Sequence, residues 1–148
     1  MSLGERETLS GLITTLIVSV LFLWRLSNQH AAGLFAGPDA LQIWARSVLL
    51  LVAISIGVAI VVAIGFSIFH RLRTGEKGDD RRDERDRDID RRALTLSWYL
   101  LSFGILGVII DLALGASAFR AMNLILALCG GSEFLKDAVK MILYRRAA

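Results

Sequence analysis

Five polar residues within or beside the apolar stretches of this 148-residue chain are the side chains best placed to do chemistry: Arg46, Asp111, Asn123, Glu133 and Lys136. An ionisable group inside a membrane helix costs roughly 2.5–3.5 kcal/mol on insertion scales, so each one needs a partner or a purpose. A carboxylate at such a position can bind a proton or a cation, or it can neutralise a nearby arginine.

Asp111 and Arg46 are expected at similar depths. Counted at 1.5 Å per residue, Asp111 lies about 6 Å below the outer end of its helix, and Arg46 about 10 Å below the outer end of its own. We therefore predict an Arg46–Asp111 ion pair that Asn123 could join. The pair either locks the second and third helices together, or forms a proton or cation site facing a small outer cavity, or contacts lipid headgroups.

Glu133 and Lys136 follow the pair Gly130-Gly131, in a stretch where apolar residues keep helical spacing. Two geometries fit. A straight helix places Glu133 in the inner leaflet, where Lys136 can pair with it, whereas a kink at the glycines lays the last turns along the interface. The straight helix is favoured because residues 118–131 alone are too short to cross a membrane.

The elements that hold these residues follow from composition. The chain is 55% hydrophobic and 21% charged, but nine of its 17 basic and eight of its 14 acidic residues lie in the segment 71–92. The remainder is too apolar for a small soluble domain. Because a spanning helix needs about 20 apolar residues, we predict one all-α domain over 1–148, with four transmembrane helices at about 8–26, 40–72, 93–114 and 118–144.

Orientation follows from the basic residues beside these helices. The segment 71–92 and the C-terminal end carry most of them, and cytoplasmic flanks are enriched in Lys and Arg. We therefore expect both termini and the middle segment in the cytoplasm.

The charged segment 71–92 is expected to form a cytoplasmic hairpin whose second part is a helix continuous with the third span. Opposite charges four residues apart, at Asp83/Arg87 and Asp88/Arg92, support such a helix. The segment is either a solvated topology signal or a docking surface. Its candidate docking residues are Asp83, Glu84, Arg85, Asp86 and Arg87. Alternating signs favour a protein partner and argue against nucleic acid, because the carboxylates would repel phosphates.

The run Asp83-Glu84-Arg85-Asp86-Arg87, placed shortly before the third span, resembles the D-E-R-D motif of an uncharacterised family of small four-helix bacterial membrane proteins. The resemblance covers roughly the C-terminal half. It implies a bacterial inner-membrane location and carries no activity. The charge continues here through Asp88 and Asp90, where the family pattern usually turns apolar.

Small residues recur every four positions on the second helix, at Ser55, Ala59, Ala63 and Ser67, and glycines mark the third helix at Gly104 and Gly107. Such spacing lets helices approach closely in lipid. The partner is either another helix of the same chain or a second copy, a dimer being the first expectation.

No catalytic, metal-binding or cofactor-binding residue is predicted. His30 and His70 are expected on opposite sides of the membrane, and Cys129 lies in an apolar run without a nearby histidine. We therefore expect a non-enzymatic interaction or accessory protein that docks a partner or another copy through its charged helix. The alternative is a minimal homo-oligomeric ion or proton-coupled transporter or channel that uses Asp111, Arg46 and Glu133.

Overall fold

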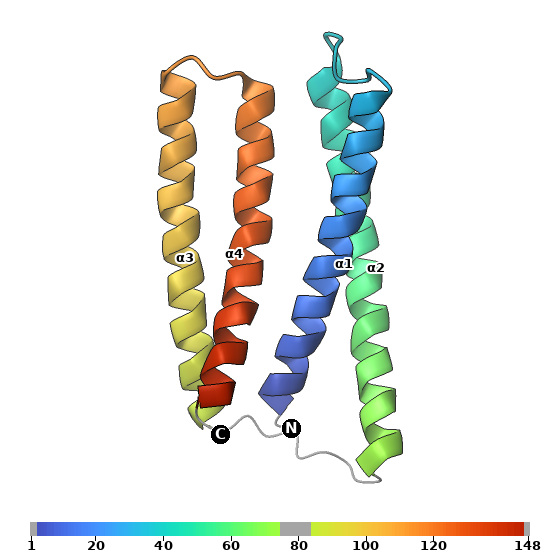
Figure 1. The fold of residues 1–148 in the computed structure, drawn as a ribbon, viewed down its shortest axis with the longest axis vertical. Coiled ribbons are helices and arrows are strands. Elements are labelled where there is room, and N and C mark those ends of the chain that lie inside the picture. Colours follow the sequence, from blue (N-terminus) through green and yellow to red (C-terminus); the bar gives the residue numbers. More distant parts are fainter. Residues whose placement is uncertain (1–2, 75–83, 147–148) are drawn as a thin grey trace.

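A computed structural model describes residues 3–74 and 84–146, which form four α-helices: α1 (Leu3–Ala31), α2 (Ala40–Thr74), α3 (Glu84–Ala113) and α4 (Ala118–Arg146) (Figure 1). Each helix is long and apolar enough to cross a membrane, which indicates a multi-pass membrane protein. The predicted all-α fold is thus confirmed. The expected first helix, 8–26, is too short at both ends, and the charged residues 75–83 lie outside the described residues.

The two hairpin turns are closed by glycines. Gly33 and Gly115 have φ angles of 70° and 97°, which favour glycine. After α3, the amide of Gly115 donates to the carbonyl of Leu112 at 3.0 Å, and that of Ala116 to Asp111 at 3.1 Å. The same pair of bonds follows α1, and this pattern is the Schellman motif. The motif keeps both connections short, so consecutive helices are antiparallel.

At mid-height the helices lie in the order α3, α4, α1, α2, and toward the hairpin end α2 crosses α1 (Figure 1). α4 packs against α3 and α1, and α1 also packs against α2. Among the described helices, α2 and α3 do not pack together as a pair. We call the end with residues 32–39 and 114–117 the hairpin end, and the opposite end, where α1 begins and α4 finishes, the termini end.

The bundle has a partly polar interior and an apolar exterior. Buried apolar side chains such as Leu51 and Val108 share the interior with buried Thr8, Ser97 and Asp137. Large aliphatic residues are exposed on all four helices, as at Val20, Leu49, Leu106 and Ile142. A monomeric soluble protein rarely exposes such continuous apolar surface, so this pattern agrees with helices that face lipid.

The small residues behave differently on α2 and α3. At Gly104 an added Cβ would meet three atoms of the Leu128 side chain, so this glycine brings α3 close to α4. The small-residue face of α2, in contrast, is exposed along Ala59, Ala63 and Ser67. The expectation that this face packs within the chain is therefore wrong for Ala59, Ala63 and Ser67, because α2 packs mainly against α1 and meets α4 only nearer the hairpin end.

Two expected continuities are confirmed. α3 runs unbroken from the charged Glu84 to Ala113, and α4 runs unbroken through Gly130-Gly131. The straight form of α4 carries Glu133 and Lys136 onward to the termini end.

Candidate functional site

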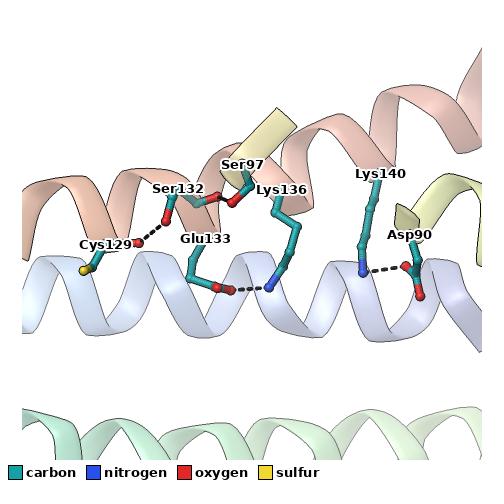
Figure 2. Close-up of polar contacts among 7 residues, drawn as sticks. All are labelled: Asp90, Ser97, Cys129, Ser132, Glu133, Lys136 and Lys140. Carbon is teal, nitrogen blue, oxygen red and sulfur yellow. Dashed lines mark hydrogen bonds and ion pairs between the residues drawn. The ribbon is translucent and has the colours of Figure 1, made fainter. Parts of the chain in front are cut away.

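Charged side chains gather at the termini end where α1, α3 and α4 meet (Figure 2). Lys140 of α4 reaches Asp90 of α3, with 2.6 Å between Nζ and Oδ1, and Lys136 pairs with Glu133 one turn earlier on α4. Both lysine side chains are largely covered, at 18% and 22% exposed, while Glu133 remains 59% exposed. We call the set around these pairs the inner polar cluster, and define it as Asp86, Asp90, Glu133, Lys136, Asp137, Lys140 and Tyr144.

Asp137 is the buried carboxylate of this cluster. It is 7% exposed and faces Gly11 of α1, where an added Cβ would lie only 2.5 Å from Oδ2. The side chain makes no hydrogen bond or ion pair with any residue that the structure describes, and the cations beside it are Lys136 and Lys140, which flank it on α4. A glycine at position 11 is therefore what allows α1 to pass over a carboxylate.

Gly4 has the same role at a level nearer the terminus. An added Cβ there would collide with the Tyr144 hydroxyl and come 3.1 Å from Oδ1 of Asp86. Tyr144 and Asp86 are 2% and 6% exposed. Thr8, between the two glycines, turns inward and donates its hydroxyl to the carbonyl of Gly4 at 2.7 Å. Gly4, Thr8 and Gly11 are thus the face of α1 that covers the cluster.

α3 and α4 are joined above the cluster by serines (Figure 2). The Ser97 hydroxyl donates to the backbone carbonyl of Ser132 at 2.9 Å, and the Ser132 hydroxyl donates to the carbonyl of Cys129 at 2.8 Å. These bonds satisfy buried hydroxyls next to the glycine pair. The Ser97–Ser132 bond sets the register of α4 along α3, and this register brings Lys140 next to Asp90.

The charged residues at the start of α3 are divided between the buried and the exposed side of the helix. Asp86, Ile89, Ala93 and Ser97 form its buried stripe. Asp90 turns toward Lys140, and Asp88 binds Arg92 at 2.9 Å. Four arginines face outward instead, and we call them the arginine face: Arg85, Arg87, Arg91 and Arg92. Of the four carboxylates in this stretch, Asp86 and Asp90 turn inward while Glu84 and Asp88 are exposed, so the outer surface carries more arginines than carboxylates.

At the hairpin end, the expected Arg46–Asp111 pair is wrong. Asp111 pairs with Arg120, with 3.0 Å between Oδ2 and Nε, and Arg46 is exposed. The pair depends on which helices are neighbours. Asp111 and Arg120 flank the short turn between α3 and α4, whereas α2, which carries Arg46, does not pack on α3. Asn123 does not join Asp111 either, because its Oδ1 accepts the indole N–H of Trp44 at 2.9 Å.

A cleft of about 400 Å³ opens between α1, α2 and α4 toward the hairpin end. Its walls are mainly aliphatic, and Asn123, Ser19 and Ser55 are among the few polar groups that reach it. The cleft fits an apolar occupant, and it does not reach the inner polar cluster.

The structure brings together only some of the predicted residues. Glu133, Lys136 and Asp86 belong to the inner polar cluster, whereas Glu84, Arg85 and Arg87 are exposed and Asp83 lies outside the described residues. Sequence reasoning grouped Asp137 and Lys140 with Glu133 and Lys136, but it did not single out Asp90 or Tyr144 and did not predict that Asp137 is buried against α1. The available signal was on α1, where Gly4, Thr8 and Gly11 recur at helical spacing and leave space for polar neighbours.

The chemistry of the inner polar cluster is that of ion pairing and proton exchange. Within residues 3–74 and 84–146, no group of three His, Cys, Asp or Glu side chains is placed to hold a metal ion. Asp137 is a buried carboxylate between two lysines, an arrangement that can bind a proton or stabilise a nearby positive charge. The exposed arginine face, by contrast, can bind an anionic surface.

No protein-family model, curated protein or solved structure matches this chain. The resemblance of residues 83–87 to a D-E-R-D motif therefore stays a prediction.

Proposed function

We propose that this chain is a non-enzymatic interaction protein of a bacterial inner membrane, which docks an acidic segment of a partner on the arginine face of α3. In this proposal both termini and the start of α3 are cytoplasmic. The observation that carries it is the excess of positive charge on the outside of α3: four arginines are exposed beside only two exposed carboxylates, Glu84 and Asp88, because Asp86 is buried and Asp90 turns toward Lys140. A net positive surface attracts an acidic partner and speeds its association.

Rigidity supports the proposal. Ile89 and Ala93 are 6% and 0% exposed, so the turns that carry the arginines are packed against the bundle. The pair between Lys140 and Asp90 ties the same turns to α4. A surface that is already ordered loses less entropy on binding than a flexible tail. A charge run that served as a topology signal alone would not need this packing.

The test replaces Asp88 by a photo-crosslinking amino acid and recovers adducts from living cells. We expect one dominant protein adduct, either a partner or a second copy of this chain. Charge reversal by Arg85→Glu with Arg87→Glu should abolish the adduct. The matched control reverses Arg145 and Arg146, which are exposed at the end of α4, and should leave the adduct in place. An adduct that survives the α3 reversal, or no adduct at all, contradicts the proposal.

A second proposed function is transport of a proton or cation, which the buried Asp137 favours. Asp137 replaces Asp111 and Arg46 as the candidate transport residue, because Asp111 pairs with Arg120 and Arg46 is exposed. The test measures proton and cation flux into liposomes that hold the purified protein. Transport requires a flux that Asp137→Asn abolishes and that Arg46→Gln leaves unchanged. Equal flux in wild type and Asp137→Asn contradicts this function.

A further inference from the structure

Polar and aromatic side chains share one side of α3 in the turns that follow Arg87. Arg91, Thr95 and Tyr99 follow one another at four-residue spacing, which places them on the same side of the helix. They line a shallow groove of about 360 Å³ together with Asp88, Arg92 and Leu96. A neighbouring groove of about 320 Å³ continues from Thr95 and Tyr99 over Leu94 and Trp98. The surface therefore passes from basic to aromatic to aliphatic within three turns.

The depth of this groove matches a membrane boundary. Arg91 lies 22 residues before Ala113, the last residue of α3, which corresponds to about 33 Å of helix at 1.5 Å per residue. The hydrocarbon core of a bilayer is about 30 Å thick. With the hairpin end of α3 at one boundary, Arg91 therefore lies level with the phosphates of the opposite leaflet. Tyr99 starts deeper, but long side chains on a helix point toward its N-terminus, which here is toward Arg91.

The charges of the groove favour an anion. Two of the three nearby carboxylates face away from the groove, because Asp90 binds Lys140 and Asp86 is buried, and the third, Asp88, lines the groove paired with Arg92. The Arg91 side chain is exposed and makes no ion pair with any side chain in the described helices. A guanidinium binds a phosphate through two parallel hydrogen bonds, which is its strongest mode of recognition.

We propose that this groove binds an anionic phospholipid of the leaflet at the termini end. Arg91 contacts the headgroup phosphate beside the Asp88–Arg92 pair, and Tyr99 and Trp98 lie against the glycerol and the upper acyl chains. Amphipathic aromatic rings occupy this depth in membrane proteins. The site uses Arg91 of the arginine face, whereas the crosslinking test of partner docking reverses Arg85 and Arg87, which lie outside the groove. The two proposals can therefore fail independently.

The experiment titrates the full chain in mild detergent with phosphatidylglycerol or phosphatidylcholine. It follows bound lipid by native mass spectrometry and the thermal midpoint by circular dichroism. Wild type should bind phosphatidylglycerol in preference and gain thermal stability from it. Arg91→Gln should weaken phosphatidylglycerol binding about tenfold, equivalent to about 1.4 kcal/mol. Arg91→Lys should recover some of that loss, because a lysine keeps the charge without the bidentate geometry.

Arg87→Gln is the matched control, since Arg87 is an exposed arginine one turn away and outside the groove. It should bind phosphatidylglycerol as wild type does. Equal weakening by Arg87→Gln and Arg91→Gln would show a general charge effect and overturn the site. Equal binding of phosphatidylcholine, or equal stabilisation by inorganic phosphate, would overturn the assignment to an anionic lipid.

Discussion

Substitution of Gly104 by alanine tests the close packing of α3 on α4. The new Cβ would lie 2.8 Å from Cδ1 and 3.1 Å from Cγ of Leu128, with Cδ2 closer still. Carbon atoms in good contact are about 3.5–4.0 Å apart, so the helices must separate by roughly 1 Å or Leu128 must leave its rotamer. Overpacking of this kind costs about 1–3 kcal/mol.

Gly107 provides the matched control on the same helix, because nothing lies within 4 Å of an added Cβ there. Alanine in place of a helical glycine stabilises by about 0.5–1 kcal/mol at either position. That gain cancels between the two variants. The difference in free energy of unfolding between Gly104→Ala and Gly107→Ala is therefore the overpacking alone, about 1–3 kcal/mol.

The assay is reversible unfolding in mixed detergent micelles, followed by circular dichroism. A double-mutant cycle tests whether Leu128 is the cause of the loss, because Leu128→Ala removes the atoms that the new methyl group meets. Gly104→Ala should then cost less in the Leu128→Ala background than in wild type, a coupling that reports direct contact. If Gly104→Ala and Gly107→Ala have the same free energy of unfolding, or if the effects in the cycle are additive, this packing of α3 on α4 is refuted.

Two ion pairs give the remaining predictions. Lys140→Met should lower the free energy of unfolding by about 1–3 kcal/mol, because it leaves the partly covered Asp90 carboxylate without its lysine; adding Asp90→Leu should recover most of the loss, and an unrecovered loss would contradict the pair. At the hairpin end, a double-mutant cycle of Asp111→Asn with Arg120→Gln should show a coupling below about 1 kcal/mol, as expected for a pair with an exposed arginine. The same cycle with Arg46→Gln should show none, and a larger coupling to Arg46 would restore the pair expected from depth alone.

The helices were predictable from the sequence because apolar length alone specifies a span. α2 and α4 lie close to their predicted limits. α1 extends to Ala31, beyond the expected residue 26, because the polar residues after Trp24 continue the helix until Gly33 closes it. Gly33 itself is the signal that could have placed this end, because glycine is the usual residue just after a helix, where φ is positive.

The ion pairs were only partly predictable, because depth along a helix says nothing about which helices are neighbours. Lys136–Glu133 and Asp88–Arg92 are local pairs on one helix, and both are confirmed. Asp111 pairs across a turn that the sequence already made short.

Lys140–Asp90 links two helices, and its prediction required the register between α3 and α4. The Ser97–Ser132 bond and the Gly104–Leu128 contact set that register. Neither can be read from hydrophobicity.

The charge pattern of residues 84–92 shows the same limit. Along the sequence the signs alternate, which favours a mixed surface. A helix of 3.6 residues per turn places Asp86 and Asp90 on the buried side, and leaves Glu84, Asp88 and the arginines exposed. The burial of Asp86 against Gly4 and Tyr144 decides which side faces inward.

The central claim is that a four-span chain presents the arginine face of α3 to the cytoplasm, and cysteine labelling tests it most directly. The native thiol is removed by Cys129→Ala, and single cysteines are placed by Ala36→Cys at the hairpin end and Arg87→Cys on the arginine face. Spheroplasts are treated with a maleimide that does not cross membranes. We predict that Ala36→Cys is labelled in intact spheroplasts, and that Arg87→Cys is labelled only after the membrane is opened. Labelling of Arg87→Cys in intact spheroplasts would contradict the claim.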